Sequence, residues 1–261
     1  MPLPKIDILI PAIEKDLGTL PYVIDSVRKQ VKHPIGKFMI VSPDSKKIRQ
    51  LCARKGCTFI NEKTVLPITK KSINYQSARW DRSGWLFQQL LKLGGSKLGK
   101  QDYYLVIDAD TVLIRPHVFK TTGGRTVFYY RKWSQPEYFK TYKKLMGRKA
   151  DSPTSFVTHY MLFERAKVAR LKRIIEAKHQ TSWHSAIIRS INKKQQFGFS
   201  EFETYGNFLH AHYRNQYVLK KALNTSLHMN ASGLTEAKRK KLALKYRSVS
   251  FHKRKAYSKR P

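Results

Sequence analysis

Short apolar runs alternate with helical patterns along the first half of the chain. Runs typical of β-strands lie at residues 6–10, 37–41, 58–60 and 103–107. Between them, apolar positions at helical spacing indicate helices at 19–31, 44–55 and 79–93. Strands that alternate with helices in this way favour parallel pairing. The pattern therefore predicts an α/β fold whose mainly parallel sheet is flanked by helices.

The second half of the chain is less regular. Its patterns indicate a strand at 127–130, a strand or loop at 154–163, and helices at 136–146, 164–178 and 182–191. From residue 236 onward the composition changes, because this segment holds eleven Lys or Arg and a single acid, Glu236. We therefore expect one globular domain over residues 1–235 and a basic tail over 236–261.

The overall composition says more about partners than about shape. Hydrophobic residues make up 41% of the chain, which is enough to build a core. The 52 Lys and Arg outnumber the 17 Asp and Glu, and the net charge is +35. Such an excess points to an anionic partner, such as nucleic acid, an anionic lipid surface or a phosphorylated polymer.

The two cysteines and the distribution of apolar residues bear on localisation. Cys52 and Cys57 are read as free thiols in a reducing compartment, because no second pair is present to complete a structural zinc site. The apolar stretch at the N-terminus is too short for a signal peptide, and no apolar run approaches the ~20 residues of a spanning helix. We expect a cytoplasmic protein whose membrane contact, where it exists, is peripheral at the inner face.

Two carboxylates stand directly after the most apolar strand pattern. Asp108 and Asp110 follow residues 103–107, and ligands of open α/β sheets bind beyond the carboxyl ends of the strands. Carboxylate oxygens suit Mg²⁺ or Mn²⁺, which keep positions open for substrate phosphates. Such a metal stabilises the charge that develops on a departing nucleotide. The pair predicts a divalent-metal site, although two surface aspartates in a turn give the same string.

A second enzyme class shares this local pattern. The sequence VIDADTV also fits haloacid-dehalogenase-like phosphatases, in which the first aspartate is the nucleophile. That family begins its core with this strand and needs a later acidic pair, whereas here three strands precede the motif and no paired aspartates follow it. The phosphatase therefore stays a less favoured alternative.

Several segments in a fixed order carry a more specific likeness. They are residues 10–29, 82–93, 104–114, 155–163 and 199–209. Together they resemble GT-A nucleotide-sugar glycosyltransferases, and most closely a group of uncharacterised bacterial and viral glycosyltransferases with a DxD motif. The resemblance implies a GT-A (Rossmann-like) fold, a nucleoside-diphosphate-sugar donor, with a UDP-sugar favoured, and Mn²⁺ or Mg²⁺ as the cofactor. The acceptor would be a glycan or a lipid-linked molecule, as in the synthesis of surface polysaccharides.

The resemblance also assigns donor-site residues by position. Asp108 and Asp110, with Ala109 between them, would bind the metal and the diphosphate. The loop after the first strand and the helix before the carboxylates would line the nucleotide-sugar pocket, and their candidate residues are Pro11, Ala12, Glu14, Lys15, Trp85 and Gln89. Lys15 as a solvated surface residue and Trp85 as an ordinary core residue remain alternatives.

Catalytic and further metal-binding residues are sought among the remaining acids and histidines. Glu201 and Glu203 lie on one face if their segment is extended, where a carboxylate could deprotonate or orient an acceptor hydroxyl. They could equally neutralise nearby cations. His159 is a third candidate for the acceptor site. Many GT-A enzymes add a histidine near the C-terminus as a metal ligand, for which His228 is the first choice and His212 the second.

The basic segment at the C-terminus leaves three partners open. It could bind an anionic membrane surface, a phosphorylated acceptor, or single-stranded nucleic acid through the aromatic residues among its cations. The carboxylate pair upstream favours the membrane or a lipid-linked acceptor. A nucleic-acid-binding protein with an incidental DxD string is the main alternative outside the enzymes.

Overall fold

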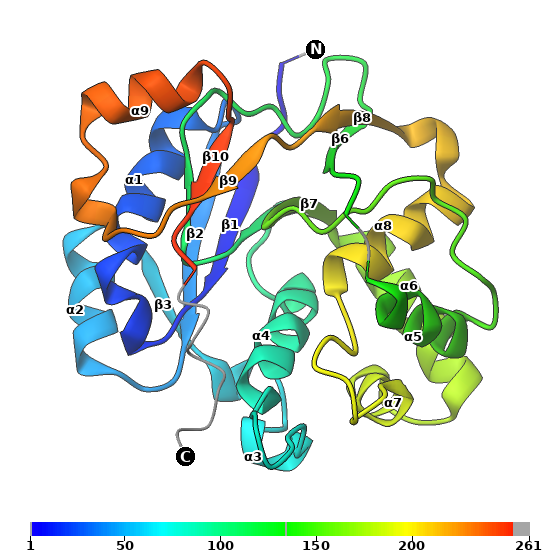
Figure 1. Cartoon of the computed structure of the whole chain (residues 1–261). Coiled ribbons are helices and arrows are strands. Elements are labelled where there is room, and N and C mark those ends of the chain that lie inside the picture. The colour runs from blue at the N-terminus through cyan, green and yellow to red at the C-terminus, as the bar shows by residue number, and fades with distance from the viewer. Residues whose placement is uncertain (1, 134, 253–261) are drawn as a thin grey trace.

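A five-stranded sheet lies at the centre of the computed structural model, which describes residues 2–133 and 135–252 (Figure 1). Its strands are β1 (Ile6–Pro11), β2 (Ile35–Ser42), β3 (Thr58–Asn61), β4 (Tyr103–Ile107) and β7 (Tyr160–Glu164). They are arranged in the order β3-β2-β1-β4-β7. The first four strands are parallel, and β7 runs antiparallel to β4. All four parallel strands therefore end at the same edge, where the chain passes from β4 to Asp108.

Helices cover both faces of this sheet. On one face, Ile8 and Ile10 of β1 share a hydrophobic cluster with residues of α1 (Leu20–Gln30) and α2 (Lys46–Arg54). On the other face, Leu9 joins the cluster of α4 (Ser83–Gly94). Successive side chains of a strand point to opposite faces, so an unbroken apolar run such as Ile8–Ile10 requires cover on both.

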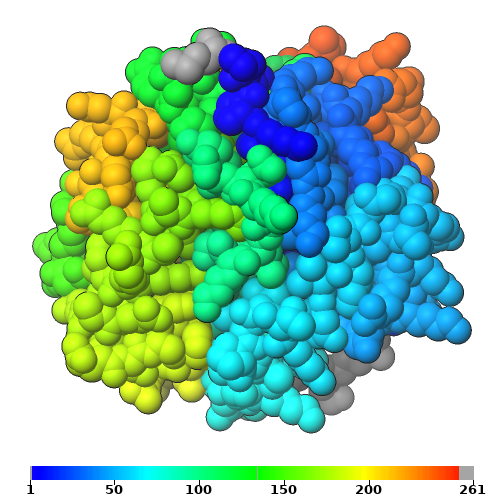
Figure 2. All heavy atoms as spheres, turned by 180° about the vertical axis from the view of Figure 1, so that it is seen from behind, coloured from blue at the N-terminus to red at the C-terminus, as the bar shows by residue number. Residues whose placement is uncertain are grey.

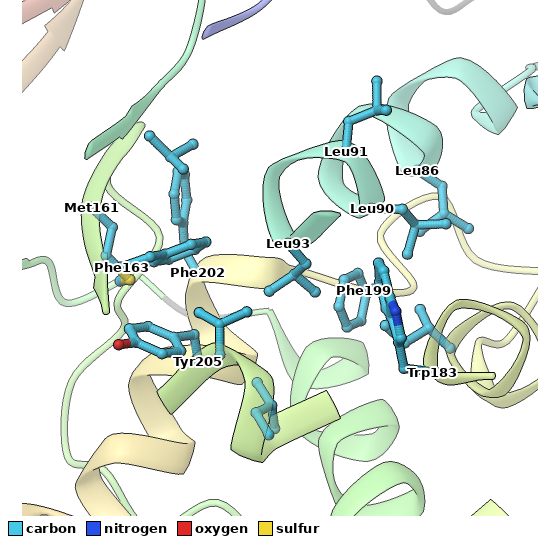
Figure 3. Close-up of a cluster of buried hydrophobic side chains, with 14 of the residues drawn as sticks. Leu86, Leu90, Leu91, Leu93, Met161, Phe163, Trp183, Phe199, Phe202 and Tyr205 are labelled. Carbon is cyan, nitrogen blue, oxygen red and sulfur yellow. The ribbon is translucent and has the colours of Figure 1, made fainter. Parts of the chain in front are cut away.

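The second half of the chain adds a block of helices next to the sheet. It consists of α5 (Pro136–Met146), α6 (Arg165–His179), α7 (Trp183–Ser190) and α8 (Glu201–His212). In the core between this block and α4, Leu90 and Leu93 lie close to Phe199 and Trp183, and Phe163 of β7 lies by Tyr205 (Figure 3). Seen from behind, the N-terminal half and the helical block lie side by side, with the chain around β4 between them (Figure 2).

Shorter elements complete the described part of the chain. A three-stranded sheet pairs β10 (Ser248–Ser250) with both β5 (Thr111–Leu113) and β9 (Asn224–Ser226), and β6 (Thr126–Tyr130) pairs with β8 (Tyr217–Lys221). The remaining helices are α3 (Lys70–Ile73), α9 (Glu236–Ala243) and the 3₁₀ turns Glu14–Gly18, Glu62–Thr64, Gly95–Lys97, Arg214–Gln216 and Ala231–Gly233.

The structure corrects two expectations about the C-terminal part. Residues 236–252, expected to begin a basic tail, instead form α9 and β10, because Val249 and Phe251 are buried in the core beside β5. Residues 253–261 lie outside the described residues. The segment with Glu201 and Glu203 is the first turn of a helix and not an extended strand, and the Ser200 hydroxyl caps it by accepting the Glu203 amide at 3.2 Å.

The predicted α/β class and mainly parallel sheet are confirmed. No helix in the described ranges has both the length and the apolar character to cross a membrane.

Candidate active site

The carboxylate pair lies where the parallel strands end. Asp108 follows β4 directly, and its amide donates to the His159 carbonyl at 2.9 Å, just before β7 begins. His159 has a φ of 70°, which is unusual for a residue with a side chain. In this conformation its Nδ1 donates to Asp108 Oδ2 at 3.1 Å. The β4–β7 pairing therefore places a predicted catalytic histidine against the first predicted metal ligand.

A buried cation holds Asp108 from the inner side. Lys92, on α4, donates to Asp108 Oδ1 at 2.5 Å and to Glu201 Oε1 at 2.7 Å, and its ammonium lies 4.5 Å from the centre of the Phe202 ring. Burial by itself would raise the pKa of Asp108, but the charge of Lys92 and the His159 hydrogen bond outweigh it and hold that pKa well below the usual range. Asp108 is therefore a fixed anion.

Asp110 faces the other way, toward solvent. His252 Nδ1 donates to Asp110 Oδ2 at 3.0 Å, and both side chains keep about 30% of their surface exposed. The register of β10 creates this contact, because the Phe251 amide donates to the Asp110 carbonyl at 2.9 Å. Burial alone would lower the pKa of His252, but the hydrogen bond and charge of Asp110 outweigh it and raise that pKa.

Together, two carboxylates and two imidazoles gather at this edge. The ring centroids of His159 and His252 are 4.9 Å apart, so the two histidines lie beside each other over the carboxylate pair. Within residues 2–133 and 135–252, no three His, Cys, Asp or Glu side chains form a ready-made metal cluster. Instead, the site offers one open carboxylate–imidazole pair, Asp110 and His252, next to a carboxylate that is already held.

The open pair fits a divalent cation by donor chemistry and spacing. Oxygen and imidazole nitrogen are suitable donors for Mn²⁺. Two neighbouring ligands that each lie about 2.1 Å from an octahedral ion are about 3 Å apart, and Asp110 Oδ2 lies 3.0 Å from His252 Nδ1. Ions of this type commonly take only one or two protein carboxylates and leave other positions to water and substrate phosphates.

The two glutamates of α8 do not share a face. Residues two apart in a helix point about 200° from each other. Glu201 is buried against Lys92, whereas Glu203 accepts hydrogen bonds from the Ser155 hydroxyl at 2.7 Å and the Asn207 amide at 2.9 Å. Burial raises the pKa of both carboxyl groups, and their hydrogen-bond partners oppose this rise only in part. The prediction that they lie on one extended face is wrong, and their role in catalysis stays a prediction.

The loop after β1 lies near the carboxylates. Pro11 and Ala12 are buried at the end of the strand, and the Thr19 hydroxyl at the start of α1 donates to the Ala109 carbonyl at 2.9 Å. Burial raises the pKa of Asp16 in this loop, and the charges of Asp110 and Asp108 contribute to the rise. The predicted donor loop and the carboxylate pair are therefore neighbours.

Two further donor-site candidates on this loop, Glu14 and Lys15, are exposed. Glu14 accepts a hydrogen bond from the Ser45 hydroxyl at 2.7 Å and from Lys47 at 3.3 Å, both at the start of α2. These contacts connect the loop to the ends of β1 and β2, the edge at which open α/β sheets bind their ligands.

Two donor-pocket candidates on α4 serve the core as well. Trp85 is partly buried and packs against Tyr75 and Phe197. Gln89 is buried, and its Oε1 accepts the Glu201 amide at 3.2 Å. Its Nε2 has no hydrogen-bond partner within the described residues. Gln89 thus joins α4 to the start of α8, next to Lys92.

The predicted metal-binding histidines lie elsewhere. His228 is exposed between β9 and α9 and makes no hydrogen bond to either carboxylate, and the ring of His212 packs at a tilt against Phe208 at the far end of α8. The histidine that contacts Asp110 is His252 instead. The alternation of Val249 and Phe251 with serines marks a strand that leads to this histidine, but the surrounding cations suggested a tail.

Lys92 is the second residue that the sequence analysis missed. It interrupts an otherwise apolar stretch, LLKLG, at the end of a helix. A lysine in such a stretch is rarely buried without a partner, and this signal could have linked it to the carboxylates that follow.

Comparisons with known proteins place the chain within a family. The profile of one protein family, described as "Family of unknown function (DUF6492)", matches residues 4–257. No curated protein matches the sequence.

Solved structures are similar to the chain at the level of the fold. The galactosyltransferase LgtC, solved with donor and acceptor sugar analogues, is 14% identical with a TM-score of 0.51, and the match covers 94% of this chain and 87% of LgtC. An active-site mutant of LgtC is 16% identical with a TM-score of 0.49 over the same shares. At this identity the likeness concerns the fold, and it confirms the predicted GT-A fold.

Two mycobacterial proteins of known structure match only part of the chain. Glucosyl-3-phosphoglycerate synthase from Mycobacterium tuberculosis, solved with Mn²⁺, uridine diphosphate and glucosyl-3-phosphoglycerate, is 14% identical with a TM-score of 0.36 over 63% of this chain and 58% of that protein. Another mycobacterial protein is 15% identical with a TM-score of 0.30, and the match spans 43% of this chain and only 33% of that protein. These TM-scores are too low to define the fold.

Proposed function

The chain belongs to the DUF6492 family, and we propose that it is a metal-dependent glycosyltransferase with a nucleoside-diphosphate-sugar donor. One observation carries the proposal: Asp108 and Asp110 stand at the carboxyl end of β4 with His159 and His252 against them. The GT-A fold supports it, because the galactosyltransferase with the same fold was solved with sugar analogues. A UDP-sugar is the favoured donor.

We assign the metal to the open pair. Asp110 and His252 would hold Mn²⁺ or Mg²⁺, and His252 would then coordinate as neutral imidazole. When bound, the ion would neutralise the donor diphosphate and the charge that develops on the departing nucleotide. Lys92 keeps Asp108 ionised and in place, and His159 orients the second oxygen of this carboxylate. Asp108 thereby adds fixed negative charge beside the metal position.

The donor nucleoside would lie over the ends of β1 and β2. Pro11 and Ala12 supply a buried floor there, while Glu14 and Lys15 stand at its exposed rim. Trp85 and Gln89 belong to the helix that carries Lys92 and would support the pocket from behind. The acceptor, a glycan or a lipid-linked molecule, would approach from the side of His159 and α8.

We propose positioning roles for the glutamates of α8. Glu201 contacts Lys92 and is buried, so it fixes the ammonium that holds Asp108. Glu203 fixes the turn before β7 through Ser155 and the Phe156 amide. Direct proton transfer from an acceptor hydroxyl to either glutamate is the alternative, and for Glu201 the Gln variant decides between the two roles.

A donor screen tests the proposal directly. The purified protein is melted with a panel of nucleotide sugars, with Mn²⁺ or with excess chelator, and hydrolysis of each donor is followed in parallel. A donor that binds only the folded state, and is present at a concentration of 100 times its Kd, raises the free energy of unfolding by about 2.7 kcal/mol. We expect a UDP-sugar to raise Tm and to be hydrolysed only with the metal.

Two controls make the screen decisive. Asp110→Asn should lose the metal-dependent rise in Tm but keep the melting temperature of the free protein. Donor hydrolysis that continues in excess chelator would overturn metal dependence. If no nucleotide sugar of the panel binds or reacts, the assignment as a glycosyltransferase is wrong.

A further inference from the structure

Exposed leucines and cations meet where β8, α9 and β10 come together. We call this surface the leucine–lysine face, and its residues are Lys220, Lys221, Leu223, Lys240, Lys241, Leu244, Lys245 and Arg247. The Arg247 amide donates to the Leu223 carbonyl at 2.8 Å, which brings the end of α9 to the turn between β8 and β9. The ends of these elements lie side by side in Figure 1.

The leucines of this face belong to neither of the two hydrophobic clusters. Leu244 is 80% exposed and Leu223 is 42% exposed, and α9 has no fully buried residue. Leaving a leucine in water forgoes most of the gain from its burial. Exposed apolar side chains that lie together among polar residues mark an interaction surface.

The cations of the face lack acidic partners among the described residues, although Arg247 donates to the Pro116 carbonyl at 3.3 Å. In the described part of the chain, none of Lys220, Lys221, Lys240, Lys241, Lys245 and Arg247 forms an ion pair. The one acid of α9, Glu236, is engaged with Lys29 and Arg239, each at 3.7 Å. Arg247 lowers the pKa of Lys220, after the larger effect of burial, which indicates that like charges are crowded together here. The face therefore favours an anionic partner.

We infer that the leucine–lysine face docks on an anionic lipid bilayer. In this arrangement Leu223 and Leu244 enter the headgroup region while the surrounding lysines contact lipid phosphates. Nucleic acid could neutralise the charges of the face but would not bury its leucines, because single-stranded bases bind by stacking on exposed aromatic rings. The aromatic residue of this segment, Tyr246, is partly buried and packs against the core instead.

Docking of this face on a bilayer would also orient the molecule. β10 begins beside Arg247 and leads directly to His252, five residues further on. At about 3.3 Å per residue, the face and the carboxylate site are about 17 Å apart along this strand. A bilayer bound at the face would hold the site above the membrane surface at a fixed height. None of this depends on the reaction that the site performs.

Co-sedimentation of the full-length protein with vesicles tests the inference. Vesicles of phosphatidylcholine with phosphatidylglycerol are compared with vesicles of phosphatidylcholine alone, at low and at raised salt. We expect binding to the anionic vesicles only, and release by salt because exposed charges are screened within ~8 Å at physiological ionic strength.

Matched variants separate the face from general charge. Replacing Lys240, Lys241 and Lys245 by Gln should weaken partition about 100-fold, whereas the same change at Lys46, Lys143 and Lys149, exposed lysines elsewhere, should weaken it far less. The double variant Leu223→Ser/Leu244→Ser should weaken partition to the vesicles about tenfold. Its control is Ile13→Ser, at a residue that is 42% exposed on the donor loop, which should leave partition unchanged. Unchanged melting curves verify that each variant is folded.

Three results would overturn the inference. The first is equal vesicle binding by wild type and by the variants of the face. The second is loss of binding on removal of residues 253–261 while the leucine variant binds normally. The third is displacement from vesicles by a single-stranded oligonucleotide that binds the leucine variant as tightly as the wild type. Donor binding, measured in the same samples, should be unchanged in the variants of the face, so this test stands apart from that of the proposed function.

Discussion

Asp108 and Asp110 are one residue apart, yet their carboxylates belong to two different environments. On the inner side, Asp108 contacts a buried lysine that also holds Glu201, so three ionisable side chains lie between α4, β4 and α8. On the outer side, Asp110 accepts hydrogen bonds from His252 and, at 3.3 Å, from the Thr111 hydroxyl, and both Asp110 and His252 are partly exposed. Asp108 contacts a buried cation and keeps 21% of its side chain exposed, whereas Asp110 contacts a partly exposed histidine and keeps 30% of its side chain exposed.

This difference assigns two roles: Asp108 belongs to the structural support of the site, and Asp110 is available for its chemistry. A buried ion pair costs desolvation, and losing one partner leaves the other charge stranded. An exposed pair contributes little to stability but can exchange its proton for a metal ion or a substrate. We therefore expect variants of the inner side to change stability first, and variants of the outer side to change activity first.

The largest effect should follow loss of the outer carboxylate. Asp110→Asn preserves the shape of the side chain but removes the charge that a divalent cation requires. We expect a loss of ~10³-fold or more in donor hydrolysis and a free energy of unfolding within about 1 kcal/mol of wild type. Activity assays and urea unfolding measure the two quantities. Asp151→Asn, at a half-exposed aspartate on the surface, is the matched control, and full activity of Asp110→Asn would refute the assignment.

The second effect should be the cost of removing the inner cation. Lys92→Met leaves the buried Glu201 and the partly buried Asp108 without this cation, which should lower the free energy of unfolding by ~3–5 kcal/mol at pH 7. The folded-state pKa of Asp108 is depressed, so the stability from this group is present above the usual aspartate pKa of about 4 and is lost as the pH falls through the folded value.

Urea unfolding at several pH values checks this prediction. The difference between wild type and Lys92→Met should shrink as the pH is lowered below about 4, because the stranded carboxylates then take up protons. Lys97→Met, at an exposed lysine close by in the sequence, should change stability by less than about 0.5 kcal/mol. A difference that does not vary with pH would contradict the electrostatic account.

A smaller effect is expected from the outer histidine. His252→Ala removes one of the two proposed ligands and should weaken the apparent affinity for Mn²⁺ by about 100-fold or more, since loss of even a supporting residue of a metal site typically costs about 10–100-fold. Titration of activity with Mn²⁺ measures the shift. His228→Ala should leave the titration unchanged, because that exposed side chain makes no contact with the carboxylates. Equal shifts in both variants would show that His252 is not part of the metal site.

The smallest effect should come from Glu201→Gln. Burial raises the pKa of Glu201, so ionisation of this group costs stability as the pH rises through its folded-state value. The neutral amide removes that cost and still accepts a hydrogen bond from Lys92. We expect a change of about 1 kcal/mol or less in stability and a turnover within about tenfold of wild type. A loss of ~10²-fold in turnover with unchanged donor affinity would instead identify Glu201 as the general base.

Most of the α/β half could be predicted from local pattern. The strand expected at 103–107 is β4 with the same bounds, and the helices expected at 19–31 and 44–55 are α1 and α2. Here strand and helix periods differ clearly, and Gly and Pro mark the ends. The pattern of the second half is ambiguous, because Glu201 and Glu203 alternate with apolar residues as in a strand, while the Ser200 cap begins a helix.

The sequence by itself determined the sheet, its helices and the carboxylates at its edge, since these follow from hydrophobic periodicity and from the rule that parallel strands end together. Only the tertiary structure decided what those carboxylates contact. Lys92 lies 16 residues before Asp108, and His252 lies 142 residues after Asp110. Periodicity reports on neighbours within a turn or a strand, whereas these contacts depend on how α4 packs against α8 and how β10 pairs with β5.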